Sequence, residues 1–246
     1  MSLNLDVGKI YKTNKYGDII ILEYNSYLDV KVRFVNTGFT TVASMSNIRK
    51  GNVKDRLSPT VYGVGVVGTS STKEKGKTLV EYKVWKRMMQ RCYSHKHKEL
   101  NPAYLNCSTS DNFKNFTFFK EWTNLQVGFD KNFDLDKDIL GCGSVYHEDV
   151  CVFVPREINL LFTKRSKKVK GVSFIKKVGK FSAQICDGDG NRFLGYFENE
   201  SVAKKVYTDE KIKRIGFLIE MYKGCIDPRV CKKLSQLAEE IRYVNH

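Results

Sequence analysis

The sequence predicts an α+β protein built from three small modules, and three observations lead to this prediction. Short runs rich in Val, Ile, Tyr and Phe fill residues 8–50, a strand–loop–strand–helix pattern occupies 133–164, and three further strands precede helices in 172–241. With 246 residues, of which 41% are hydrophobic, the chain can bury more than one core. The expected modules are 1–58, 59–165 and 166–246.

The charge balance predicts a polyanionic partner. Lysine and arginine number 42 against 27 aspartates and glutamates, which gives a formal net charge of +15 and a pI near 9.4. Duplex DNA carries about one negative charge per 1.7 Å of its axis, so double-stranded DNA is the expected partner. The last module is the most basic, with 17 cationic and 10 acidic side chains in residues 166–246. The alternative is a basic protein that binds no nucleic acid.

The first module is expected to be a small SH3-like β-barrel. Four short segments are rich in β-branched and aromatic residues, and turn-forming pairs separate them. In the third segment the alternation places Val30, Val32 and Phe34 on a single face. The expected strands span 9–13, 18–24, 30–35 and 39–43. The basic run at 48–56 is expected either to contact phosphates or to be solvated charge.

Residues 59–77 predict a glycine-rich hinge followed by a flexible loop at 70–77. The Gly-x-Gly pattern of the hinge comes from Gly63, Gly65 and Gly68. No Walker lysine follows these glycines at the required spacing, so no nucleotide cofactor is expected.

Residues 79–93 predict an amphipathic helix whose stripe of aromatic, methionine and cysteine side chains lies in the core. Lys83, Arg87 and Arg91 recur every four residues on another face. This basic ridge is expected to contact a DNA backbone. Phenylalanines at every third position of 111–122 predict a short buried helix rather than a surface that stacks on bases.

The segment 133–164 carries the candidate chemistry. Its expected elements are a strand at 133–140, a turn at 141–143, a strand at 150–154 and a helix at 155–162. Asp134, Asp136 and Asp138 alternate along the first strand and therefore share one face. Such a cluster of carboxylates in a strongly basic protein favours a metal site. The alternative is a set of exposed acids at a strand end.

This pattern resembles the HNH (His-Me finger) nucleases of phage homing endonucleases, which have a ββα-metal fold. In that family an Asp-His pair ends the first strand, and an Asn on the helix holds the metal. The matching positions here are Asp136-Lys137 and Asn159. The resemblance implies that Asp136, Asp138 and Asn159 hold a Mg²⁺ or Mn²⁺ ion and that the chain hydrolyses DNA phosphodiesters. A phage-encoded chain of this kind acts in the host-cell cytoplasm.

Lys137 stands where the family has its general-base histidine. Lysine, with a pKa of about 10.4, accepts a proton at neutral pH only where desolvation lowers that pKa. Three outcomes are open. Lys137 is a tuned base or a charge stabiliser, His147 replaces it as the base, or catalysis is lost and the chain is a DNA-binding regulator on the same scaffold.

Structural zinc and membranes are not expected. The cysteines form no Cys-x-x-Cys pair, and Cys92, Cys107, Cys142 and Cys151 fit no common zinc spacing even with two histidines nearby. No run of about 18 apolar residues is present, and the first residues lack the pattern of a signal peptide. The expected location is the cytoplasm, where the 7 cysteines remain thiols.

Residues 169–222 resemble an AP2 DNA-binding domain. Such domains open with a Gly-Val pair and carry a Gly-Lys-aromatic-x-Ala-x-Ile strand, a Leu-Gly-x-Phe strand and an alanine-containing helix. The matching residues are Gly171-Val172, Gly179-Lys180-Phe181, Ala183, Ile185, Leu194-Gly195, Phe197 and Ala203. The resemblance implies a three-stranded sheet that reads DNA, and the same module commonly follows HNH domains in phage proteins.

The residues themselves predict the same sheet. The expected elements are strands at 172–175, 180–186 and 192–197, a turn at 187–190 and a helix from Glu200. Alternation along the second strand turns Phe181 and Ile185 toward the helix, and Ser182 and Gln184 outward. Gln184 and Arg192 are expected to contact bases. The expected phosphate contacts are Lys176, Lys177 and Lys180. Family domains carry Trp and Arg where this chain has Phe and Lys, so the target sequence is not carried over.

The last segment predicts a capped helix, with Asp227 as N-cap, Pro228 as its first residue and an apolar stripe from Val230 to Ile241. This stripe is expected to dock on its own protein, and a homodimer is the alternative. The function expected for the whole chain is sequence-directed binding of double-stranded DNA with metal-dependent DNA endonuclease activity. The alternatives are a catalytically inactive regulator and an RNA-binding protein that uses the first module.

Overall fold

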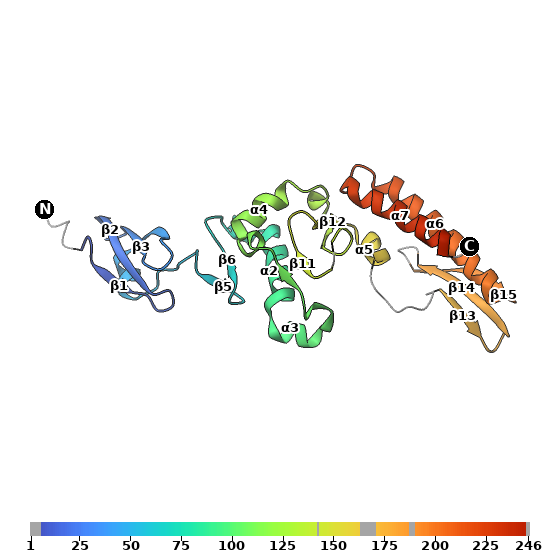
Figure 1. The fold of residues 1–246 in the computed structure, drawn as a ribbon. Helices are drawn as coiled ribbons and strands as arrows, with labels where there is room; N and C mark the ends of the chain where they lie inside the picture. Colours follow the sequence, from blue (N-terminus) through green and yellow to red (C-terminus); the bar gives the residue numbers. More distant parts are fainter. Residues whose placement is uncertain (1–5, 142, 163–170, 187–189, 245–246) are drawn as a thin grey trace. The chain divides into compact units, whose positions relative to one another are not determined.

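The computed structural model describes residues 6–141, 143–162, 171–186 and 190–244. The chain divides into two compact units, unit 1 (residues 1–122) and unit 2 (residues 123–246). Each unit combines helices with small sheets (Figure 1), which confirms the predicted mixed α+β class. The division into three modules stays a prediction, and its boundary after residue 165 lies outside the described residues. Among the described residues, no helix is long and apolar enough to cross a membrane.

Unit 1 begins with an antiparallel sheet whose strands follow the order of the sequence. The strands are β1 (Ile10–Lys12), β2 (Asp18–Ser26), β3 (Asp29–Phe34) and β4 (Thr40–Ala43). Val30, Val32 and Phe34 are buried against Ile19 and Ile21 of β2, as the alternation predicts.

The sheet is open, so the predicted β-barrel is wrong. In the described part of the chain, the outer strands β1 and β4 do not pair with one another. These strands have only 3 and 4 residues, and the next strand, β5 (Pro59–Val61), pairs with β6 (Gly65–Val66) instead. Between β4 and β5, the helix α1 (Met45–Arg49) takes the first part of the expected basic loop.

The rest of unit 1 is a hairpin and short helices around an aromatic core. The elements are β7 (Lys73–Glu74), β8 (Lys77–Thr78), α2 (Val80–Tyr93), α3 (His95–Leu100), β9 (Ser108–Thr109) and α4 (Phe116–Asn124), with 3₁₀ helices at Pro102–Tyr104 and Asn112–Lys114. Trp85 of α2 is fully buried, and its Nε1 donates to the carbonyl of Phe113 at 2.8 Å. The flexible loop expected at 70–77 is wrong, because β7 and β8 pair there as an antiparallel hairpin.

Unit 2 contains two small sheets followed by a long helical pair. Its elements are the 3₁₀ helix Phe129–Lys131, β10 (Asp134–Asp136), β11 (Val145–Tyr146), β12 (Val152–Val154), α5 (Arg156–Phe162), β13 (Val172–Ile175), β14 (Lys180–Cys186), β15 (Asn191–Phe197), α6 (Glu200–Tyr222) and α7 (Pro228–Val244). β10 pairs antiparallel with β12, and α5 follows and contacts β10. The predicted order strand–loop–strand–helix is therefore present, with shorter strands.

Strands β13, β14 and β15 form an antiparallel sheet in that order, and α6 contacts all three. Their bounds agree with the predicted strands to within one residue. Ala183 and Ile185 are buried, as expected of the side of β14 that packs on the helix. Residues 187–189 of the expected turn lie outside the described residues.

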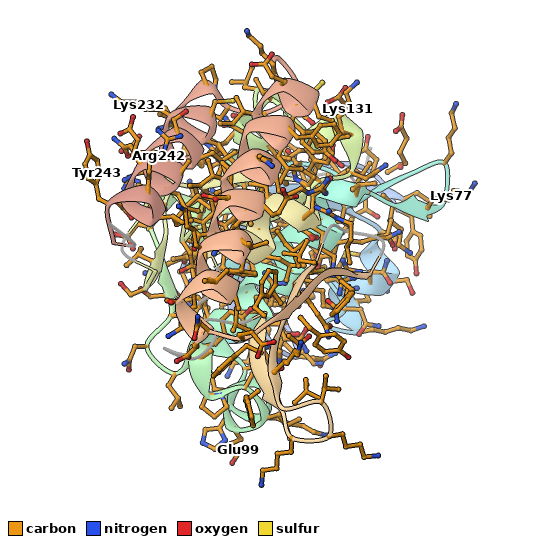
Figure 2. The ribbon with its side chains drawn as sticks, turned by 90° about the vertical axis from the view of Figure 1, so that its right-hand side faces the viewer. Lys77, Glu99, Lys131, Lys232, Arg242 and Tyr243 are labelled. Atoms are coloured by element: carbon orange, nitrogen blue, oxygen red, sulfur yellow. The ribbon has the colours of Figure 1, made fainter. Side chains whose placement is uncertain are left out.

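The start of α7 agrees with the predicted cap. The Asp227 Oδ1 accepts the backbone N–H of Arg229 at 2.8 Å, and Pro228 is the first helical residue. Val230 and Leu234 are fully buried in a core shared with β12, α5 and α6. The apolar stripe thus docks on its own unit, while Lys232, Arg242 and Tyr243 project from α7 away from α6 (Figure 2). The homodimer stays a prediction.

Candidate functional site

Asp136 closes the first strand of the strand–loop–strand–helix centre and then holds the loop that follows. Its side chain is only 5% exposed, and its Oδ1 accepts the backbone N–H groups of Asp138 and Ile139, both at 2.8 Å. Burial raises the pKa of this carboxyl group, and the two backbone hydrogen bonds partly oppose that shift. Asp136 therefore ends β10, so the strand expected over 133–140 stops at residue 136.

Lys137 lies against its own loop. It is 5% exposed, and its Nζ donates to the Asp138 Oδ1 at 2.8 Å and to the Gly143 carbonyl at 2.7 Å. The ammonium also lies 5.4 Å from the centre of the Tyr146 ring. Because the strand ends at Asp136, the expected common face of Asp134, Asp136 and Asp138 does not extend to Asp138.

Asn159 and His147 occupy separate positions around this loop. Asn159 is half-buried on α5, the helix that contacts β10. The Nδ1 of His147 accepts the backbone N–H of Asp149 at 3.2 Å. Within the described part of the chain, neither residue bonds to Asp136.

The donor set, as arranged, does not fit a divalent cation. One oxygen of Asp136 is used by two backbone N–H groups, and an ammonium group already neutralises Asp138. In the described part of the chain, no group of three or more His, Cys, Asp and Glu side chains is placed to hold a metal ion. Cys142, one of the cysteines weighed for zinc, lies outside the described residues.

Glu157, which the sequence did not single out, connects α5 to α6. It accepts hydrogen bonds from the Arg214 guanidinium and from the Tyr222 hydroxyl, the latter at 2.5 Å. The hydrogen bond to Glu157 and partial burial raise the pKa of Tyr222 to about 12. These hydrogen bonds hold α5 against α6, so the role of Glu157 is structural.

The outer face of the β13–β15 sheet differs from the predicted one. A β-bulge lies between Ala183 and Gln184, where Leu194 of β15 is an extra residue, and it reverses the alternation along β15. Gln184 therefore pairs with Phe193, and Ser182 pairs with Tyr196. Phe193 and Tyr196 are 52% and 50% exposed, and their ring centroids lie 5.0 Å apart. The sequence reasoning missed this aromatic pair.

The same bulge turns Arg192 toward the helix. Arg192 pairs with the buried Ile185, and its Nη2 bonds to the Glu210 Oε2 of α6 at 2.8 Å. The pKa of Glu210 is lowered, chiefly by this bond and next by Lys213. The outward orientation expected for Arg192 is therefore wrong, and its position on the helix side opposes the predicted contact with a base.

The other residues predicted to contact nucleic acid differ in their exposure and partners. Gln184, Lys176 and Lys177 are exposed. Ser182, which was expected only to face outward, is buried. Lys180 forms an ion pair with Glu198 at 2.7 Å. In unit 1, Lys83 and Arg87 are exposed on α2, while the Arg91 guanidinium lies over the Tyr104 ring at 5.6 Å.

No protein-family model matches the chain, and no curated protein or solved structure matches it either.

Proposed function

We propose that the chain binds double-stranded DNA in a sequence-directed manner through the outer face of the β13–β15 sheet. One observation carries this proposal. On the side away from α6, the sheet presents an amide and two aromatic rings, Gln184, Phe193 and Tyr196, and the turn before β14 adds the exposed Lys176 and Lys177. Glutamine can bond to adenine in the major groove, and aromatic carbon atoms can contact thymine methyl groups. Lysine ammonium groups favour phosphates.

Selection from a random duplex library, followed by fluorescence anisotropy on selected and scrambled duplexes, tests this proposal. Gln184→Ala is expected to relax the preference at one base pair, by about 1–3 kcal/mol, since the variant has no amide to bond to that base. Lys176→Gln with Lys177→Gln is expected to weaken binding to both duplexes equally, because phosphates carry no sequence information. Absence of duplex binding by the unaltered protein, or a preference for RNA at matched salt, would refute the proposal.

Metal-dependent DNA cleavage is the second candidate, and the connection of β10, β12 and α5 favours it. An antiparallel strand pair is followed by a helix, with Asp136 at the end of the first strand and Asn159 on the helix. The hypothesis of DNA cleavage requires Mg²⁺ or Mn²⁺ as the cofactor. One oxygen of Asp136 and one of Asp138 already accept hydrogen bonds within the loop, which opposes metal binding and favours a regulator that binds DNA without cleaving it.

Supercoiled plasmid incubated with the protein and Mg²⁺ or Mn²⁺ separates the two. Asp136→Asn is the decisive variant, because an amide oxygen can still accept the two backbone N–H groups while the charge is removed. Nicking that disappears in Asp136→Asn supports the nuclease. Tight, salt-sensitive binding without nicking in either protein supports the regulator.

A further inference from the structure

Positive charge is concentrated in unit 1 rather than on the sheet of unit 2. Residues 73–98 contain nine basic and two acidic side chains, whereas residues 171–198 contain four basic and three acidic ones. Two of the four cations on the sheet segment, Lys180 and Arg192, already have carboxylate partners. Since phosphate contacts dominate the affinity of most DNA-binding proteins, the sheet is a weak source of that affinity.

The basic segment starts with the β7–β8 hairpin, which is a defined element. Its strands pair Lys73 with Thr78 and Glu74 with Lys77. The turn residues Lys75 and Gly76 both have positive φ, 47° and 77°. Two consecutive positive φ angles are typical of the type I′ turn, whose twist matches that of a two-stranded ribbon.

The base of the hairpin is fixed to the body of unit 1. The Leu79 N–H donates to the Thr72 carbonyl at 3.0 Å, and the Ser71 Oγ donates to the Lys73 carbonyl at 2.6 Å. Before them, the Ser70 N–H donates to the Thr117 Oγ1 of α4 at 3.0 Å. The hairpin thus projects as an ordered element (Figure 2, at Lys77), so binding orders only its lysine side chains and not its backbone.

The cations of the hairpin and the exposed face of α2 are available to bind an external anion. We call six of them the basic arm: Lys73, Lys75, Lys77, Lys83, Lys86 and Arg87. All six are exposed, and within the described residues none forms an ion pair with a carboxylate. On α2 they lie opposite the buried side of Trp85, Met88 and Met89.

We infer that the basic arm is a second DNA-binding surface, which binds the phosphate backbone of the duplex and supplies sequence-independent affinity. This inference rests on the proposed function and adds to it a surface in unit 1 that reads no bases. The hairpin carries lysine without aromatic or amide side chains, and lysine binds phosphate as a point charge. Different residues therefore recognise bases, on the sheet, and bind phosphates, on the basic arm.

A hairpin variant that keeps its fold tests this inference. Lys73→Gln, Lys75→Asn and Lys77→Gln remove three charges, and Asn-Gly is the preferred sequence for a type I′ turn, so the hairpin is retained. The affinity for any duplex is expected to fall about tenfold or more near 0.1 M salt. The slope of log K against log salt is expected to become shallower by about 0.9 for each phosphate that the variant no longer neutralises.

The matched control is Lys9→Gln, Lys12→Gln and Lys15→Gln, which removes the same charge from exposed positions elsewhere in unit 1. A loss of affinity below about threefold in the control, together with the full loss in the hairpin variant and an unchanged base preference, supports the inference. Equal losses of affinity in both variants, or no loss in the hairpin variant, would overturn the inference about the basic arm. The proposed function would still stand in that case, provided that the unaltered protein binds duplex DNA. If the unaltered protein binds no duplex, both fail. The inference is also overturned if, at matched salt, the hairpin substitutions weaken binding to RNA more than binding to duplex DNA.

Discussion

Asp136 shows how one side chain serves the fold and limits the chemistry of the site. Its carboxylate satisfies two backbone N–H groups of a loop that would otherwise be left without partners. The sequence indicated that three carboxylates share one strand face, but β10 ends at Asp136 and Asp138 lies beyond the strand. The sequence did not reveal that Asp136 would accept hydrogen bonds from backbone N–H groups of the loop that follows it, because such local bonds depend on where the strand ends.

Two substitutions at Asp136 are expected to behave in opposite ways. Asp136→Ala removes the acceptor for two N–H groups and is expected to cost about 1–3 kcal/mol of stability. Asp136→Asn keeps an acceptor and removes a charge that is poorly solvated, so at pH 7 it is expected to be at least as stable as the natural protein. Hydrogen exchange at Asp138 and Ile139 reports the loop directly, and both amides are expected to lose protection only in Asp136→Ala.

The pH dependence of the Asp136→Asn effect follows from the raised pKa of Asp136. A carboxyl group whose pKa is higher in the folded state binds its proton more tightly there, so the folded protein loses stability as the pH rises from the unfolded pKa through the folded pKa. The advantage of Asp136→Asn is therefore expected to shrink toward pH 4. Denaturant unfolding of both proteins, followed by circular dichroism at pH 7 and at pH 4, measures this difference in stability. An advantage that grows on acidification would contradict the assignment.

Gly171 is required by close approach as well as by its backbone angle. It has φ +112°, and a Cβ there would lie 2.3 Å from the Gln184 carbonyl oxygen and 2.3 Å from the Tyr207 ring. Gly179 also has positive φ, +70°, but a Cβ there would meet nothing within 4 Å. Gly179→Ala is expected to cost about 1–2 kcal/mol from the backbone alone, and Gly171→Ala about 3 kcal/mol or more because backbone atoms must shift. Similar melting temperatures for the two variants would contradict this.

The secondary-structure elements were predictable where local pattern decides and unpredictable where tertiary context does. β13, β14 and β15 were found to within one residue because alternation and turn residues bound them. The β7–β8 hairpin was missed because its turn is Lys-Gly rather than Asn-Gly, and its polar strands carry no apolar alternation. The barrel was wrong because closure depends on pairing between the first and last strands, which no local pattern encodes.

The bulge in the β14–β15 pair has a consequence for base reading. It turns Arg192 to Glu210 and exposes Phe193 in its place. Arg192→Ala is expected to weaken the contact between β15 and α6, lowering stability, and to leave the base preference of the protein unchanged. Phe193→Ala is expected to do the reverse, with little effect on stability and a weaker preference at one base pair. The library selection described above, run on both variants beside thermal melts, distinguishes them. A changed base preference in Arg192→Ala would contradict the assignment of Arg192 to the side of the sheet that faces α6.

The two proposed surfaces lie in different units, so their contributions to DNA binding can be separated by arithmetic. Free-energy changes caused by substitutions at independent sites usually add. The hairpin variant and the variant Lys176→Gln, Lys177→Gln are each expected to reduce the steepness of the salt dependence in proportion to the phosphate contacts they remove. Combined in one protein, the five substitutions are expected to change log K by the sum of the separate changes, and the slopes are expected to add as well. Anisotropy titrations of one duplex over a range of salt concentrations, with all four proteins, test this. A combined effect no larger than the greater single effect would mean that both sets of lysines compete for the same phosphates. The basic arm would then not be an independent second DNA-binding surface.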